Sequence, residues 1–194
     1  ERDTFASWAS TQLHSRRAPR LRVTSGHGAE ELSANPAIRR KQTTVYASPV
    51  SGQVVITSPF GDRSHEAKDL PPGARVDNHP GIDIAGNLGD DVYSATDGRV
   101  IEVGEHPGFG KYVKVEEIGT GNIHRYNHLS KNDIFKEGSR IGASIKLGEI
   151  GSTGVSSGPH LHWEIQAPNG ASIDPTPYLG KGWITKAERD ARKE

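Results

Sequence analysis

The chain has 194 residues and a formal net charge of zero, because 24 lysines and arginines balance 24 aspartates and glutamates. This balance gives no global reason to expect a nucleic acid as the partner. No apolar run approaches the ~18 residues that a membrane-spanning helix needs, so the sequence predicts no membrane span. Cysteine is absent, which excludes disulfides and thiolate metal ligands.

Methionine is also absent, so the sequence does not begin at its own start codon, and we expect a processed product or an excised fragment. Hydrophobic residues make up 32% of the chain, and there are 23 glycines. Together with the length, these values predict one loop-rich domain with a modest core, flanked by extensions.

The two ends of the chain differ from its centre. Residues 1–48 hold arginine-rich runs such as Arg39-Arg40-Lys41 and few large apolar side chains. We predict a basic arm or linker there, either poorly structured or docking to a protein partner or an anionic cell wall. Residues 181–194 are highly charged, and we predict a tail in which Ile184–Arg192 forms a surface helix or a frayed end.

From about Ser48 the pattern becomes that of β structure, with short β-branched runs separated by glycine-rich turns. Asp97-Gly98 is a dipeptide typical of a hairpin turn. We predict a mainly β domain over residues 49–180, an antiparallel sheet or sandwich with few short helices. The expected strands are Val54–Ile56, Ile82–Ile84, Val92–Ala95, Arg99–Val103, Tyr112–Val115, Ile123–Leu129, Leu147–Ile150 and Leu161–Ile165.

An alternation of polar and apolar residues marks the run His160–Ile165. It predicts a half-buried strand with His160, His162 and Glu164 on its polar face. Residues two apart on a strand lie roughly 6–7 Å from each other, so the two imidazoles would be held side by side. By itself, such a pair is also consistent with an ordinary half-exposed polar face.

A second cluster, His79-Pro80-Gly81-Ile82-Asp83, lies far upstream. The proline and glycine disfavour a helix, so we expect a loop that enters a strand and presents His79 and Asp83. Two histidines and one aspartate are enough to hold a zinc ion and leave one position open for catalysis. A surface hydrogen bond between His79 and Asp83 is the alternative.

Six segments occur in a fixed order between residues 58 and 179, namely Ser58–Arg63, His79–Ala85, Val92–Val100, Tyr126–Ser130, Gly151–Glu164 and a final segment with the pairs Asp174-Pro175 and Tyr178-Leu179. Together they resemble the lysostaphin-type zinc metallopeptidases, which cleave peptide cross-links in bacterial peptidoglycan. The resemblance covers residues 50–180 and implies a narrow groove lined by loops. It says nothing about residues 1–48.

The resemblance also implies roles for five residues. His79, Asp83 and His162 would bind one Zn²⁺ per chain, and His128 and His160 would be the two catalytic histidines that do not bind the metal. A metal-activated water would attack the peptide carbonyl. Which of the two histidines takes a proton and which stabilises the developing negative charge stays open.

By the same resemblance, the substrate would be a stem peptide or a cross-link of peptidoglycan. The protein would then act outside the cytoplasm, in the periplasm, as a secreted protein or in a phage virion. The alternatives are a non-catalytic module that binds the wall or regulates wall enzymes, and a structural virion protein that carries a wall-degrading domain. Glu164 is a candidate for orienting a ligand histidine, and Tyr126 and Arg63 are candidates for contacting substrate. The alternatives are a solvent-facing or paired carboxylate for Glu164, which we favour, core packing for Tyr126 and a surface ion pair for Arg63.

Overall fold

The computed structural model describes residues 45–64, 68, 70–73 and 78–192. The chain divides into two units, Glu1–Gln42 and Thr43–Glu194, and all the described residues belong to the second. The basic arm expected at residues 1–48 therefore lies almost wholly outside the described residues. No helix in the described part of the chain is long and apolar enough to cross a bilayer.

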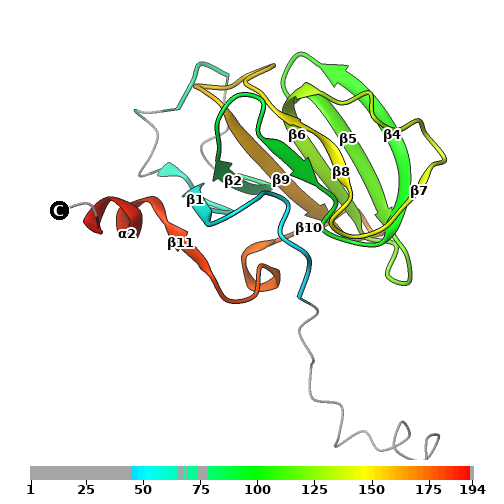
Figure 1. Cartoon of the computed structure of the whole chain (residues 1–194). Helices are drawn as coiled ribbons and strands as arrows, with labels where there is room; N and C mark the ends of the chain where they lie inside the picture. Colours follow the sequence, from blue (N-terminus) through cyan, green and yellow to red (C-terminus); the bar gives the residue numbers. More distant parts are fainter. Residues whose placement is uncertain (1–44, 65–67, 69, 74–77, 193–194) are drawn as a thin grey trace, which may run out of the picture. The chain divides into compact units, whose positions relative to one another are not determined.

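Eleven strands of the described chain form one curved, mixed sheet (Figure 1). Its main path runs β11-β1-β2-β9-β6-β5-β4-β7. The predicted mainly β fold is therefore confirmed. The strands are β1 (Val54–Ser58), β2 (Gly81–Ala85), β3 (Asp91–Tyr93), β4 (Gly98–His106), β5 (Gly110–Glu117), β6 (Ile123–Lys131), β7 (Arg140–Ile141), β8 (Lys146–Ile150), β9 (His160–Gln166), β10 (Ser172–Ile173) and β11 (Trp183–Thr185).

The core lies where the central strands meet a short side branch of the sheet. Strand β8 leaves the main path at the end of β6 and pairs with β3. Side chains of this branch, such as Val92 and Leu147, join Tyr126, Leu161 and Trp163 of the central strands in one apolar cluster. Each of these five residues is at most 1% exposed. The central strands are therefore held firmly by this core on one face, and the side chains on their other face have fixed positions.

The predicted hairpin at Asp97-Gly98 is wrong. Strand β3 pairs with β8, whereas β4 begins at Gly98 itself and pairs with β5 and β7. The Asp97 carboxylate instead accepts a hydrogen bond from the backbone N–H of Ala143 at 2.7 Å. The chain does turn at this dipeptide, but the strands before and after it, β3 and β4, pair with other strands and not with each other.

The C-terminal segment is part of the sheet. Strand β11 pairs parallel with β1, with Val54 opposite Trp183 and Ile56 opposite Thr185. Helix α2 (Lys186–Ala191) follows at once. Buried residues also lie on both sides of the range 49–180, since Tyr46 is 8% exposed and Ile184 is 9% exposed. The proposed domain boundaries at 48 and 180 stay predictions.

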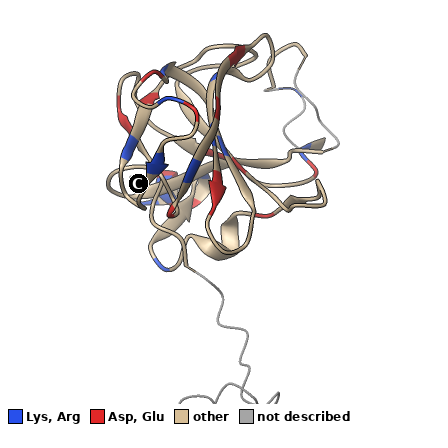
Figure 2. Cartoon of the chain, turned by 90° about the vertical axis from the view of Figure 1, so that its right-hand side faces the viewer, with Lys and Arg blue, Asp and Glu red and all other residues tan. Residues whose placement is uncertain are grey.

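Charged residues of both signs are interspersed over the side of the molecule seen in Figure 2. Lys114 lies 2.5 Å from Glu102, and Lys146 lies 2.6 Å from Asp91 and 2.9 Å from Glu149. Such exposed pairs contribute little to stability, typically ~0–1 kcal/mol each. These surface pairs therefore give no indication of a functional site.

Candidate functional site

Pairing of β2 with β9 brings the two sequence clusters together. The strands are antiparallel, and their register places Asp83 directly opposite His162 and Ala85 opposite His160. Side chains that are directly opposite in an antiparallel pair lie ~4.5–5.5 Å apart at Cβ and interact. Residues separated by 79 positions in the sequence thereby become neighbours on the face of the sheet away from the core.

His79 reaches the same point from the loop that precedes β2. Its backbone forms two hydrogen bonds with Gly61, one of 2.7 Å and one of 2.9 Å. Its ring Nδ1 lies 2.6 Å from the carbonyl oxygen of Pro59, to which it donates. Gly61 has a φ of 93°, a backbone conformation that favours glycine. The Pro59–Gly61 turn therefore fixes both the position and the ring orientation of His79.

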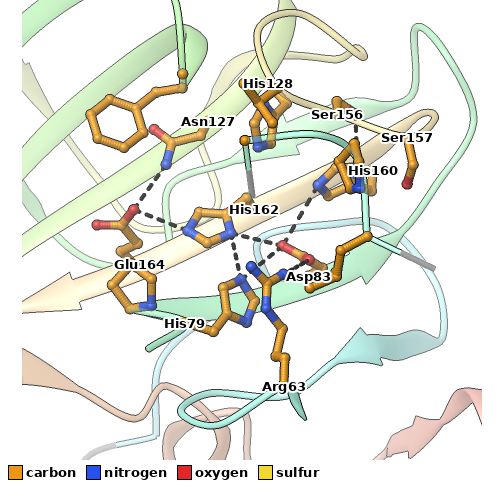
Figure 3. Close-up of a pocket in the computed structure, with 17 residues that line it drawn as sticks. Arg63, His79, Asp83, Asn127, His128, Ser156, Ser157, His160, His162 and Glu164 are labelled. Carbon is orange, nitrogen blue, oxygen red and sulfur yellow. Dashed lines mark hydrogen bonds and ion pairs between the residues drawn. The ribbon is translucent and has the colours of Figure 1, made fainter. Parts of the chain in front are cut away.

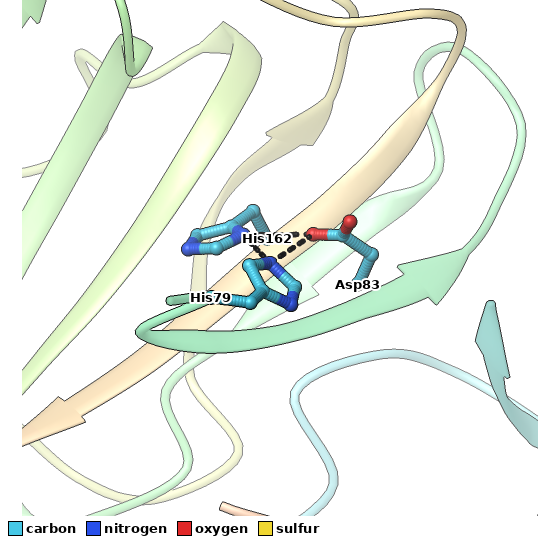
Figure 4. A group of neighbouring side chains, drawn as sticks. All are labelled: His79, Asp83 and His162. Atoms are coloured by element: carbon cyan, nitrogen blue, oxygen red, sulfur yellow. Dashed lines mark hydrogen bonds and ion pairs between the residues drawn. The ribbon is translucent and has the colours of Figure 1, made fainter. Parts of the chain in front are cut away.

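Three side-chain atoms of His79, Asp83 and His162 converge on one point (Figure 4). His162 Nδ1 lies 2.7 Å from Asp83 Oδ1 and 2.9 Å from His79 Nε2, and His79 Nε2 lies 3.3 Å from Asp83 Oδ1. A tetrahedral metal site with bonds of about 2.0–2.1 Å keeps its ligand atoms about 3.3 Å apart. The three atoms are therefore spaced almost as one face of such a tetrahedron.

The outward nitrogens of both rings are already occupied, which decides where their lone pairs point. His79 donates from Nδ1 to Pro59, and His162 donates from Nε2 to the carboxylate of Glu164 at 3.0 Å. The other nitrogen of each ring, Nε2 of His79 and Nδ1 of His162, points at the Asp83 carboxylate and is the atom that would bind a metal ion once it has lost its proton. A backbone carbonyl or carboxylate behind a ligand histidine is typical of metal sites. The donor set fits a divalent cation.

The electrostatics of the cluster also favour a cation. Burial alone would lower the pKa of His162, but hydrogen bonds to Asp83 and Glu164 raise it to about 9. Burial would likewise raise the pKa of Asp83, yet hydrogen bonds from His162 and His79 hold it well below its usual range. Without a metal, the cluster keeps a proton between the ring and the carboxylates. A metal ion would replace that proton and satisfy the same negative charge.

Glu164 supports His162 from the side away from Asp83. Its carboxylate is buried and also accepts from Asn127 Nδ2 at 3.1 Å (Figure 3). It accepts in addition from Arg125 at 3.2 Å. The guanidinium of Arg125 in turn lies over the ring of Phe109, 4.6 Å from its centre. Glu164 is therefore not a solvent-facing carboxylate, and its contact with His162 favours the orienting role considered from the sequence.

His128 owes its position to a bulge in β6. Leu129 pairs with Lys111 and Tyr126 with Val113, so Asn127 and His128 together face one residue of β5. His128 has a φ of 60°, which is uncommon for a residue with a side chain. Strict alternation would send one of these two side chains into the core, and the bulge lets both line the same cavity.

His128 and His160 flank the three-residue cluster on one side, with ring centres 4.8 Å apart. Each ring is held by a backbone carbonyl, because His128 Nδ1 donates to Thr153 and His160 Nδ1 donates to Gly158, both at 2.8 Å. Burial and the neighbouring His160 lower the pKa of His128 to about 4, so its ring is neutral at neutral pH. His160 Nε2 lies 3.6 Å from Asp83 Oδ1.

All five residues singled out in the sequence line one cavity of about 270 Å³ (Figure 3). Its other walls include Arg63, which lies 3.5 Å from Asp83, and the apolar side chains of Phe109 and Val155. Tyr126 does not line it. The Tyr126 ring is fully buried, and its hydroxyl accepts a hydrogen bond from the backbone of Ala95 at 2.8 Å, so its role is structural.

Sequence reasoning did not identify Asn127, Arg125 or Phe109. Asn127 directly precedes His128, and a period-two pattern cannot place both on one face. Arg125 and Asn127 do share a face by alternation, and the register pairs them with Glu164 and His162. This alternation is the sequence signal that could have identified Arg125 and Asn127 as partners of the two site residues. Phe109 lies between two glycines in a turn, where the sequence pattern carries no facing information.

Residues 77–175, just over half of the chain, match the family described as Peptidase family M23. Peptidoglycan DD-endopeptidase ShyA of Vibrio cholerae is 37% identical over 117 residues, which is 60% of this chain and 26% of ShyA. The chain therefore spans about a quarter of that relative.

Two solved structures resemble this chain in both fold and sequence. The catalytic domain of lysostaphin from Staphylococcus simulans matches with a TM-score of 0.56 and 30% identity, covering 65% of this chain and 92% of that domain. A zinc containing peptidase from Vibrio cholerae matches with a TM-score of 0.57 and 34% identity, covering 68% of this chain and 39% of that one. The sequence match, the fold and the ordered motifs lead to one conclusion: the chain belongs to peptidase family M23, the lysostaphin-type metallopeptidases.

Proposed function

We propose that this protein is a zinc-dependent endopeptidase that hydrolyses stem-peptide or cross-link bonds of bacterial peptidoglycan. The observation that carries the proposal is the convergence of three ligand-type atoms, 2.7–3.3 Å apart, in a cavity with two further histidines. ShyA, a relative by sequence, is named as a peptidoglycan DD-endopeptidase. Action on the cell wall would place the protein outside the cytoplasm.

In this proposal, His79, Asp83 and His162 hold the zinc ion. Two nitrogens and one carboxylate oxygen are a donor set that zinc accepts, and three protein ligands leave a fourth position open. When bound, zinc supplies a Lewis acid and lowers the pKa of a water molecule towards neutral. Glu164 keeps the proton of His162 on Nε2 and so keeps Nδ1 available.

His128 and His160 are proposed to handle protons and developing charge beside the metal. Their Nδ1 atoms donate to backbone carbonyls, so Nε2 is the remaining position on each ring. A neutral ring accepts a proton there, and a protonated ring donates to an oxyanion or a leaving amine. The lowered pKa of His128 suits a ring that is neutral between turnovers and gives up a captured proton readily.

The decisive experiment is mass spectrometry of the fragments that the protein releases from purified sacculi of Gram-negative and Gram-positive bacteria. We expect the zinc-loaded protein to release uncross-linked muropeptides. Chelation or the variant His162→Ala should abolish that release. The variant Gln166→Ala is the matched control, because Gln166 lies on the same strand and outside the cavity.

Circular dichroism of each variant would check that loss of activity is not loss of fold. Release that persists in both the chelated protein and the His162→Ala variant would contradict the proposed role of the cluster. Absence of release from every wall type by the folded, zinc-loaded protein would contradict the proposed substrate. The masses of the fragments would also identify the bond that is cleaved.

A further inference from the structure

A second cavity, of about 360 Å³, adjoins the first one beside Asp83 and His160. The two cavities share four lining residues, Leu70, Asp83, Ser157 and His160, so they form one continuous depression. The second cavity differs in its chemistry. The first one has apolar walls around Phe109, whereas the second has hydroxyl groups and one lysine. Its remaining lining residues are Thr57, Ser58, Gly158, Pro159 and Lys186.

Lys186 comes from the C-terminal segment, outside the residues 77–175 that match the family. The register of β11 against β1 ends with Thr185 opposite Ile56. The next residue of each segment, Thr57 of β1 and Lys186 of α2, lines the second cavity. Thr185 and Glu188 then form a capping box, in which the Thr185 N–H donates to the Glu188 carboxylate at 2.7 Å and the Glu188 N–H donates to the Thr185 hydroxyl at 3.2 Å. These bonds define where the backbone of Lys186 starts α2.

Among the described residues around the second cavity, one positively charged side chain has no ion-pair partner. Asp83 is already in contact with His79, His162 and Arg63. Among the described residues, neither the Lys186 ammonium nor the Ser157 hydroxyl has a hydrogen-bonding or ion-pair partner. Lys186, which is exposed, and Ser157 both line the second cavity. An ammonium and a hydroxyl on the walls of one cavity are suited to an anionic oxygen group.

We infer that the second cavity binds a carboxylate of the peptide substrate, with Lys186 as its ion-pair partner and Ser157 as a further donor. The inference rests on the proposed function, since the cavity begins at the proposed metal ligand Asp83. A peptide lying along the depression would place apolar groups against Phe109 and a carboxylate next to Lys186. The carboxylate is either the terminal one of the peptide or one on a side chain, and the test distinguishes these sources.

The test compares cross-linked muropeptide dimers with free carboxylates to dimers in which either the terminal or a side-chain carboxylate is a carboxamide. We expect the wild-type protein to cleave the carboxylate form with a kcat/KM about threefold to fivefold higher, the size that an exposed charge pair gives. Lys186→Gln should remove this preference and Lys186→Arg should keep it. Lys181→Gln is the control, because Lys181 is exposed on the same segment and lines neither cavity.

A binding measurement separates this inference from the proposed function. NMR titration with a product peptide that carries the carboxylate, and with its amide, needs no turnover. Shifts at Ser157 and Lys186 that require both the carboxylate and the lysine would support the subsite even if no dimer were cleaved. Equal binding and cleavage of both forms, or a preference that survives in Lys186→Gln, would overturn it.

Discussion

Replacing Glu164 by glutamine tests whether the carboxylate behind His162 strengthens the metal site. The side chain keeps its size and one acceptor oxygen, but it loses the negative charge that faces His162 Nε2 at 3.0 Å and Arg125 at 3.2 Å. Hydrogen bonds to a charged group contribute about 1.5–3 kcal/mol and neutral ones about 0.5–1.5 kcal/mol. The difference at His162 is therefore about 1–1.5 kcal/mol.

A change of that size corresponds to about a tenfold weaker zinc affinity, within the range known for residues that support metal ligands. Competition with a fluorescent zinc chelator at fixed pH measures the dissociation constant directly and does not depend on catalysis. Glu149→Gln is the matched control, since Glu149 pairs with Lys146 on β8 and lines neither cavity. A Glu164→Gln variant whose zinc affinity stays within twofold of the wild-type value would refute the reasoning.

Three further predictions concern backbone geometry and pH. In Gly81→Ala the new Cβ would lie 2.3 Å from the carbonyl oxygen of Trp163, so we expect a loss of roughly 1–3 kcal/mol in the free energy of unfolding, measured in urea. His128→Gly should lower kcat at least ~100-fold while the protein keeps its fold by circular dichroism, because glycine suits a φ of 60°; a folded variant that keeps its kcat would contradict this. Burial would raise the pKa of Glu117, but the His124 ring 3.7 Å away and hydrogen bonds from Thr120 and Tyr46 lower it from 4.5 to about 2. Its contribution to stability is therefore complete above pH 4.5 and is lost as the pH falls towards 2, a loss that should be smaller in Glu117→Gln when urea unfolding is followed over that range.

The sequence carried enough information to predict the face of β9 but not its partners. Alternation alone placed His160, His162 and Glu164 together, because a strand repeats every two residues. The register that sets Asp83 opposite His162 depends on how two distant segments pair. Here the family resemblance supplied what periodicity could not, and the roles of the individual residues stay proposals until they are tested.

Two other features could not be read from local pattern for physical reasons. The bulge at His128 is a one-residue shift in the register of β6 against β5, at the point where the other edge of β6 passes from pairing with β9 to pairing with β8. A single sequence shows none of these pairings. The Asp97-Gly98 turn failed as a hairpin for the same reason, since a turn dipeptide does not specify which strand comes next.

Strand β11 has a consequence for how copies of this protein behave towards each other. It covers the outer edge of β1, whose run Val54–Ile56 is β-branched and buried. An uncovered edge of this kind is a template for pairing with another chain, whereas a short edge strand followed by charged residues is a poor one. We therefore expect edge-to-edge aggregation of the protein to be prevented by the three residues Trp183–Thr185 and the charged turn of α2.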